Sequence, residues 1–143
     1  MFKKQTPWRA LVCLSLSLLC AFCLCACRVD ATGSWENATY LKDTTLGEGS
    51  KTVAVKVKAD DQEITLTIRT DKATLREAMD EHELLTGEDG AYGLYIHSVN
   101  GIRAVYEEGG YYWKITKNGE LTSVGVDAIT VSDGEQYEFT KTK

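Results

Sequence analysis

Apolar and polar side chains alternate over two neighbouring stretches of the chain. Residues 52–59 carry valine or alanine at every second position, and residues 64–68 repeat the pattern with isoleucine and leucine. A period of two is typical of a strand that buries one face. Asp60 and Asp61 separate the two stretches and favour a turn. The pattern therefore predicts a first β-hairpin with one face on the core.

The apolar period changes to about 3.6 residues after Asp71, which is typical of a helix. Thr74 and Glu77 have the spacing of a capping box, in which each side chain accepts a hydrogen bond from the backbone N–H of the other residue. The apolar stripe that follows consists of Leu75, Ala78, Met79, His82 and Leu85. We predict one helix of about three turns, and we expect Gly87 to end it with a positive φ.

Two Asn-Gly dipeptides, each next to strand-like residues, predict two further hairpins. Asn100-Gly101 separates residues 94–99 from residues 102–106, and Asn118-Gly119 follows residues 111–117. Both residue types tolerate the positive φ that a type I′ turn requires. We expect the two hairpins to build one antiparallel platform that is rich in tyrosine.

The remaining segments are less regular. A turn at residues 132–135 leads into a last alternating strand over residues 136–140, and residues 121–129 form a loosely patterned connection. Residues 35–46 contain aromatic and apolar side chains and predict an extra strand or a strap that lies on the domain. With only one helix, the expected fold class is α+β, with a mixed or antiparallel sheet packed on that helix.

The N-terminus has the composition of an export signal. Three basic residues precede an uncharged span, residues 10–27, which ends in Leu24-Cys25-Ala26-Cys27. This ending resembles the lipobox of bacterial lipoproteins, and the resemblance implies cleavage after Ala26 and lipid attachment to Cys27. The alternative is an uncleaved membrane anchor, because 18 uncharged residues are close to the minimum for a spanning helix. Either interpretation places the rest of the chain on the extracytoplasmic side of the cell membrane.

Composition excludes several classes of site. All five cysteines lie within residues 13–27, so the exported part has no thiol pair for a disulfide and no cysteine ligand for a metal. Without its first three basic residues, the chain has 13 Lys and Arg against 21 Asp and Glu. We therefore expect no nucleic-acid partner, because phosphate binding depends on basic side chains. With only two histidines, we also expect no metal site and no cofactor.

Four side chains of the tyrosine-rich region are candidate ligand contacts: Tyr95, Tyr112, Trp113 and Asn118. Strand alternation places Tyr112 opposite Trp113, so Tyr112 is the better exposed candidate. Trp113 is open to two interpretations, a stacking surface for a flat ligand or an inward core residue. Asn118 is explained most simply by its turn, although such a turn could also meet a ligand.

No catalytic residue is predicted. His97 and Ser98 are neighbours on a strand and point to opposite faces, so they cannot act together as base and nucleophile. The acidic pairs occur in turn-like positions, such as Asp60-Asp61, where solvation explains them better than glycoside chemistry. We therefore expect a protein that is not an enzyme.

The order of these elements, with the stretches LREAM, YGLYIHSVNGI, YYWKITKNGE, GVD and SDGEQYEF, resembles the transcobalamin-like C-terminal domain family. Many bacterial members of that family are catalogued as a domain of unknown function. The resemblance covers about residues 52–143 and implies a β-grasp-like fold, in which a sheet curls around one helix. It also implies a ligand of cobalamin or corrinoid type. In the cobalamin carriers a second domain covers the vitamin, so this chain would supply half of a pocket.

The chain is thus expected to consist of a lipoprotein signal peptide at residues 1–26, a tether or strap at residues 27–51, and a transcobalamin-like domain at residues 52–143. We expect a membrane-anchored lipoprotein that binds a soluble ligand and passes it to a transporter or surface protein. The alternative is a cell-surface adhesion module that binds a protein or a cell-wall polymer through the same aromatic face.

Overall fold

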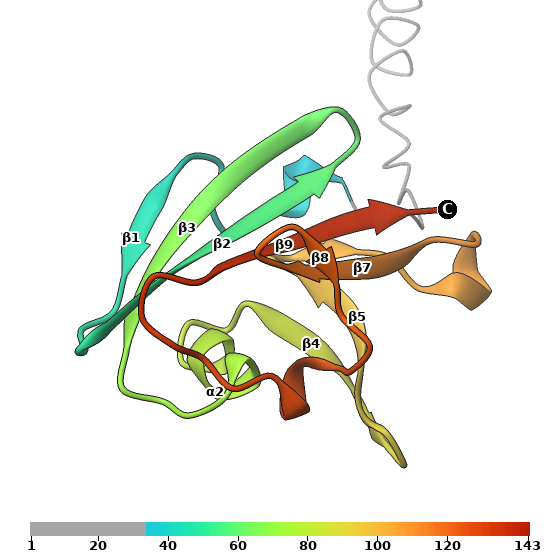
Figure 1. Ribbon diagram of the computed structural model, residues 1–143. Helices are drawn as coiled ribbons and strands as arrows, with labels where there is room; N and C mark the ends of the chain where they lie inside the picture. The colour runs from blue at the N-terminus through green and yellow to red at the C-terminus, as the bar shows by residue number, and fades with distance from the viewer. Residues whose placement is uncertain (1–33) are drawn as a thin grey trace, which may run out of the picture.

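The computed structural model describes residues 34–143, which form two β-sheets and one short α-helix (Figure 1). The strands of the larger sheet are β1 (Thr44–Leu46), β2 (Lys51–Ala59), β3 (Gln62–Thr70), β7 (Tyr112–Lys117), β8 (Glu120–Leu121) and β9 (Gln136–Thr142). The smaller sheet consists of β4 (Leu85–Gly90), β5 (Gly93–Val99) and β6 (Ile102–Arg103). The α-helix is α2 (Leu75–Asp80), and the 3₁₀ turns are η2 (Trp35–Asn37), η3 (Tyr106–Glu108) and η4 (Val126–Ala128).

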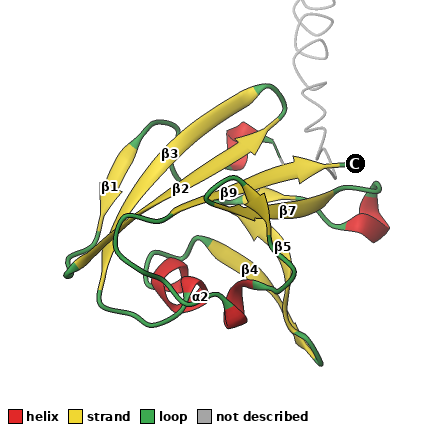
Figure 2. Ribbon diagram, viewed as in Figure 1, coloured by secondary structure: helices red, strands yellow, loops and turns green. Residues whose placement is uncertain are grey.

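The strand order is β1-β3-β2-β9-β7-β8 in the larger sheet and β4-β5-β6 in the smaller one. Figure 2 shows that strands dominate the domain and that its helical segments are short. The predicted signal peptide and Cys27 lie outside the described residues. No helix within residues 34–143 is long and apolar enough to cross a membrane.

The first predicted hairpin is confirmed. β2 and β3 pair antiparallel along their whole length, and the alternate residues with buried side chains face the core. Asp60 and Asp61 form the turn with φ of 49° and 64°. Asn and Asp residues adopt a positive φ more readily than most other residues, so the Asp-Asp pair can close a tight turn.

The capping box is confirmed, but the predicted length of the helix is wrong. The backbone N–H of Glu77 donates to Thr74 Oγ1, and the Glu77 carboxylate accepts from the N–H of Thr74, both at 3.2 Å. The helix ends at Asp80, and Glu83 adopts a φ of 54° in the turn that follows. Gly87 does not end the helix but lies in β4, because this segment pairs with β5 instead of continuing the apolar stripe.

The two Asn-Gly hairpins are confirmed, but the single platform is wrong. Asn100 and Asn118 have φ of 52° and 48°, followed by Gly101 at 78° and Gly119 at 86°. However, β5 and β6 belong to the smaller sheet, whereas β7 and β8 belong to the larger one. The two hairpins lie in different sheets because the first strand of each pairs along its length with a different strand. β5 pairs with β4, and β7 pairs with β9.

The ends of the chain complete the larger sheet. The last strand, β9, lies between β2 and β7, parallel to the first and antiparallel to the second. The predicted extra strand is β1, which pairs parallel to β3. Upstream of it, the indole Nε1 of Trp35 donates to the carbonyl oxygen of Ala59 at 2.7 Å, which holds the strap on the domain.

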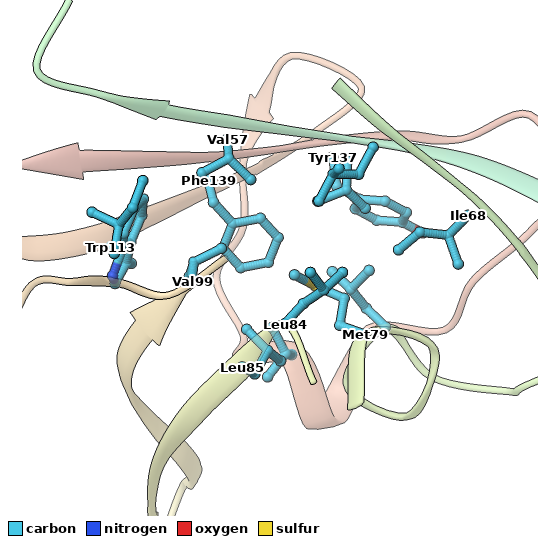
Figure 3. Close-up of a cluster of buried hydrophobic side chains, with 14 of the residues drawn as sticks. Val57, Ile68, Met79, Leu84, Leu85, Val99, Trp113, Tyr137 and Phe139 are labelled. Carbon is cyan, nitrogen blue, oxygen red and sulfur yellow. The ribbon is translucent and has the colours of Figure 1, made fainter. Parts of the chain in front are cut away.

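The core lies between the inner face of the larger sheet, the smaller sheet and α2. Figure 3 shows Phe139 and Tyr137 of β9 pointing toward Leu84, Leu85 and Met79 across this space. Both aromatic side chains are fully buried. Each buried aromatic contributes roughly 150–250 Å² of contact area, so β9 is a main source of stability as well as the link between β2 and β7.

Candidate functional site

Two shallow grooves lie on either side of the segment that follows the β7–β8 hairpin. The larger one, here the turn groove, has a volume of about 540 Å³. Its lining residues are Lys117, Asn118, Glu120, Leu121, Thr122, Ser123, Val124, Ala128, Ile129 and Thr130. The smaller one, here the edge groove, has a volume of about 340 Å³ and is lined by Tyr112, Trp113, Lys114, Ile115 and residues 121–124. Residues 121–124 therefore form a ridge that both grooves share.

The ridge carries apolar side chains that face solvent. Leu121 is 70% exposed and Val124 is 49% exposed, while Tyr112 beside the edge groove is 42% exposed. Single exposed apolar residues are ordinary, but three around one pair of grooves are typical of a surface that a ligand or partner covers. This cluster makes the hairpin region the candidate functional site.

Polar side chains of the turn groove are held in place by hydrogen bonds. Lys117 Nζ lies 2.8 Å from a carboxylate oxygen of Glu135, and Asn118 Oδ1 accepts from the N–H of Gln136 at 2.9 Å. Burial favours the neutral form of Glu135, but its bonds with Lys117 and Tyr137 outweigh this and lower its pKa. Burial and the hydrogen bond to Glu135 raise the pKa of Tyr137. Lys117, which lines the groove, is therefore held by Glu135, and the same carboxylate accepts a hydrogen bond from the hydroxyl of Tyr137.

A second ion cluster holds η4, whose last residue, Ala128, lines the turn groove. Arg76 of α2 binds Asp127 of η4 at 2.7 Å, Asp89 of β4 at 2.6 Å and Asp80 at 3.3 Å. The other oxygen of Asp127 accepts from the N–H of Leu94 at 2.7 Å. Arg76 lowers the pKa of Asp127, and the bond from Leu94 adds to this effect. With the bond from Leu94, the cluster joins α2, β4, β5 and η4.

The structure brings three of the four predicted contact residues together. Tyr112, Trp113 and Asn118 all lie on the β7–β8 hairpin, next to one or other groove. Trp113, however, is only 8% exposed and belongs to the core, so it does not present a ring face to a flat ligand. Its Nε1 is buried and has no hydrogen-bond partner among the described residues. The inward interpretation of Trp113 fits this position.

Tyr95 lies apart from the hairpin. Its neighbours Leu94 and Ile96 pack on the core, so the Tyr95 side chain points away from it, on the outer face of the smaller sheet. The Tyr95 hydroxyl donates to Glu107 at 2.9 Å, and its ring meets the ring of His97 edge-on at 5.3 Å. Tyr112 lies on the outer face of the larger sheet, so the two tyrosines do not share one surface.

The sequence did not point to Leu121 or Val124, because residues 121–129 have no regular period. The available signal was position alone: Leu121 comes two residues after the Asn118-Gly119 turn, where the returning strand of a hairpin is expected. That strand stops after two residues, and this early end leaves both side chains exposed.

The described residues offer little reactive chemistry near these grooves. His97 is half-buried, whereas its neighbour Ser98 is buried and faces the other way. Within residues 34–143 there is no group of three or more His, Cys, Asp or Glu side chains placed to hold a metal ion. The side chains at the grooves include exposed apolar groups, the amide of Asn118 and the ammonium group of Lys117, which is paired with Glu135.

Comparisons with known proteins agree with the resemblance found in the sequence. Residues 72–143 match the family model described as Domain of unknown function (DUF4430). A crystal structure of a protein from Ruminococcus gnavus ATCC 29149, to which metal binding is ascribed, is 34% identical with a TM-score of 0.62 and covers 66% of this chain and 98% of that one. No curated protein sequence matches.

Haptocorrin in complex with Cbi is similar at 20% identity and a TM-score of 0.57. The match covers 68% of this chain and 26% of the haptocorrin chain. At this identity the likeness shows the fold alone. The match nevertheless confirms that the sheet-rich fold is similar to that of a transcobalamin-like domain.

Proposed function

Because this chain belongs to the DUF4430 family of domains of unknown function, and because its fold is similar to part of haptocorrin, we propose that it binds a soluble ligand of corrinoid type. In this proposal it is not an enzyme. The sheet curls around α2 in a β-grasp-like manner, and Cys27 carries the lipid that anchors the chain outside the cytoplasm. The bound ligand then passes to a transporter.

The observation that carries the proposal is the cluster of exposed apolar side chains at the Asn118-Gly119 turn of a haptocorrin-like fold. A corrinoid is a broad, flat ring with amide groups on its rim. Leu121 and Val124 suit the apolar part of such a ring, while Asn118 and Lys117 suit its amides. The turn groove is large enough for part of the ring, which fits a domain that covers one side of its ligand.

The binding test uses two leucines with the same exposure. Leu121 and Leu41 are both 70% exposed, but only Leu121 lines the turn groove. Cobalamin or cobinamide is titrated into the detergent-solubilised full chain and followed by calorimetry. We expect Leu121→Asp to weaken binding about tenfold or more, because lost apolar contact worth about 1.4 kcal/mol corresponds to a factor of ten. Tyr112→Ala should also weaken it, and Leu41→Asp should leave it unchanged.

Two results would argue against this function. The first is the absence of binding by either corrinoid and by a broad panel of flat metabolites. The second is an equal loss in Leu121→Asp and Leu41→Asp, which would mean that the effect comes from charge and not from the groove.

The anchor is tested separately. A Cys27→Ala chain should fail to incorporate labelled fatty acid and should leave the membrane fraction. If it still incorporates label, the lipid is attached elsewhere, whatever the outcome of the ligand titrations.

A further inference from the structure

β7 has a partner along the whole of one side but only along part of the other. β9 pairs with all six residues of β7, whereas β8 pairs only with Thr116 and Lys117. The chain then turns away after a last bond from the N–H of Thr122 to the carbonyl oxygen of Ile115, at 3.1 Å. The first half of β7 is therefore an edge of the larger sheet.

The register shows which backbone groups this edge presents. The N–H of Asn118 donates to Gln136 of the β9 strand at 2.7 Å, so the even-numbered residues of β7 direct their backbone groups toward β9. Trp113 and Ile115 consequently direct theirs away from β9. Among the described residues, the N–H and C=O of Trp113 have no backbone partner on that side.

The space beside these groups is the edge groove. It is bounded by residues 112–115 on one side and by residues 121–124 on the other. A strand added to this edge would lie about 4.8 Å from β7, on the side where Trp113 lines the groove. The edge thus combines main-chain hydrogen-bonding groups with room for an added strand.

The other sheet edges in the described part of the chain are poorly suited to strand addition. β6 and β8 have two residues each, β1 has three, and β1 follows Lys42 and Asp43. β4 carries a bulge at Thr86/Gly87 and the acidic pair Glu88 and Asp89. Short edges, bulges and charges are the usual devices against edge pairing. The open part of β7 has no bulge, and Lys114 is its one charged side chain.

We propose that this edge of β7 binds an extended segment of another polypeptide by strand addition, with an apolar residue beside Tyr112 and an acidic residue beside Lys114. Tyr112 and Lys114 lie on the same outer face, because Trp113 between them faces the core. No ion pair to Lys114 is present among the described residues. Leu121 pairs with Thr116 and extends the apolar part of that face. Main-chain bonds would supply affinity and the alternate side chains specificity.

The charge on the outer face supports an acidic partner residue although the domain as a whole is acidic. Alternation places four basic side chains but two acidic ones on this face of the larger sheet. They are Lys56, Lys58, Arg69 and Lys114 against Glu63 and Glu138.

A second copy of the chain suits this edge less well. Pairing that uses both Trp113 and Ile115 of two copies sets Lys114 opposite Lys114, and like charges directly opposite are destabilising. Residues 34–143 also carry 12 Lys and Arg against 20 Asp and Glu, so two copies repel each other.

The test uses a fluorescently labelled, acetylated and amidated peptide, Thr-Val-Thr-Glu-Thr-Val-Thr, and the detergent-solubilised full chain. Fluorescence anisotropy should show saturable binding, and a peptide with Lys in place of Glu should bind up to about fivefold more weakly, the value of one exposed charge pair. Two further peptides carry N-methyl groups at alternate positions, one set in each. In a strand paired with β7, alternate N–H groups of the peptide point toward β7 and the others point away from it. We therefore expect methylation of one set of N–H groups to abolish binding and methylation of the other set to leave it unchanged.

Protein variants locate the contact. Lys114→Glu should reverse the preference, so that the Lys peptide binds better than the Glu peptide. Lys56→Glu makes the same charge change on the same face but on β2, away from the edge, and should keep the original preference.

Three outcomes would overturn the proposal: no binding of the Glu peptide, equal binding of the two N-methylated peptides, or self-association of the chain that Lys114→Glu changes while the peptide has no effect. The last outcome would mean that the edge of β7 binds a second copy of the chain. Corrinoid binding is measured independently, so loss of one activity does not decide the other.

Discussion

Replacement of Asn100 by glycine separates two roles that one residue performs in the β5–β6 turn. Asn100 is fully buried and has a φ of 52°, a conformation that glycine adopts without strain. Its side chain also holds the strap: Oδ1 accepts from the N–H of Tyr40, and Nδ2 donates to the carbonyl oxygen of Tyr40, both at 2.9 Å. Asn100→Gly therefore keeps the turn and removes two hydrogen bonds.

The expected loss follows from the position of these bonds. A buried backbone group left without a partner costs about 1–3 kcal/mol, and Tyr40 is half-buried, so the two bonds together are worth about 2–4 kcal/mol. Asn118 provides the matched control, since it occupies the same position of the same kind of turn. Its side chain makes one exposed bond, with the N–H of Gln136, so Asn118→Gly should cost at most about 1 kcal/mol. The conformational cost of introducing glycine is common to both variants.

The assay is urea denaturation of the two variants and the parent chain, followed by tryptophan fluorescence, because Trp35 and Trp113 are both buried. We expect Asn100→Gly to lower the free energy of unfolding by about 1–3 kcal/mol more than Asn118→Gly does. Equal losses would refute the reasoning, because they would mean that the turn geometry, and not the bonds to Tyr40, sets the value of Asn100.

Other predictions concern packing and pH. A Cβ at Gly87 would overlap the backbone carbonyl oxygen of Tyr95, whereas a Cβ at Gly125 would meet nothing within 4 Å. Gly87→Ala should therefore lower the melting temperature strongly, and Gly125→Ala should leave it nearly unchanged. Arg76 lowers the pKa of Asp127, so the ionised form of Asp127 stabilises the fold above its unfolded pKa of about 4. The difference in unfolding free energy between the parent and Asp127→Asn should be largest near neutral pH and should shrink as the pH falls below about 4; a difference that stays constant from pH 7 to pH 3 would contradict this assignment.

The sequence predicts the parts of this fold that depend on neighbouring residues. The alternation in β2 and β3, the capping box at Thr74 and the two Asn-Gly turns are all local patterns, and the structure confirms each of them. The presence of a last strand was also predictable, because residues 136–140 alternate after the turn at residues 132–135. In these cases the period or the turn residue acts within a few residues, so no distant partner is needed to interpret it.

The errors lie where a distant partner decides the outcome. Leu85 is buried both in the predicted helix and in the observed strand, so the apolar pattern alone could not tell α2 from β4. Pairing with β5 decides this segment in favour of a strand. The same holds for Trp113, since alternation places it opposite Tyr112 but does not say which of the two faces is covered.

By itself, the sequence determined a sheet-rich domain with one helix, its turns, and an alternation that sets Tyr112 apart from Trp113. Only the tertiary structure decided that β9 enters between β2 and β7, that the two tyrosine-bearing hairpins belong to different sheets, and that residues 121–124 form a ridge between two grooves. The physical reason is that the backbone N–H and C=O groups that pair strands are the same in nearly all residues, so they do not select a particular partner strand. Which strands meet depends on how all the apolar faces can be buried at once.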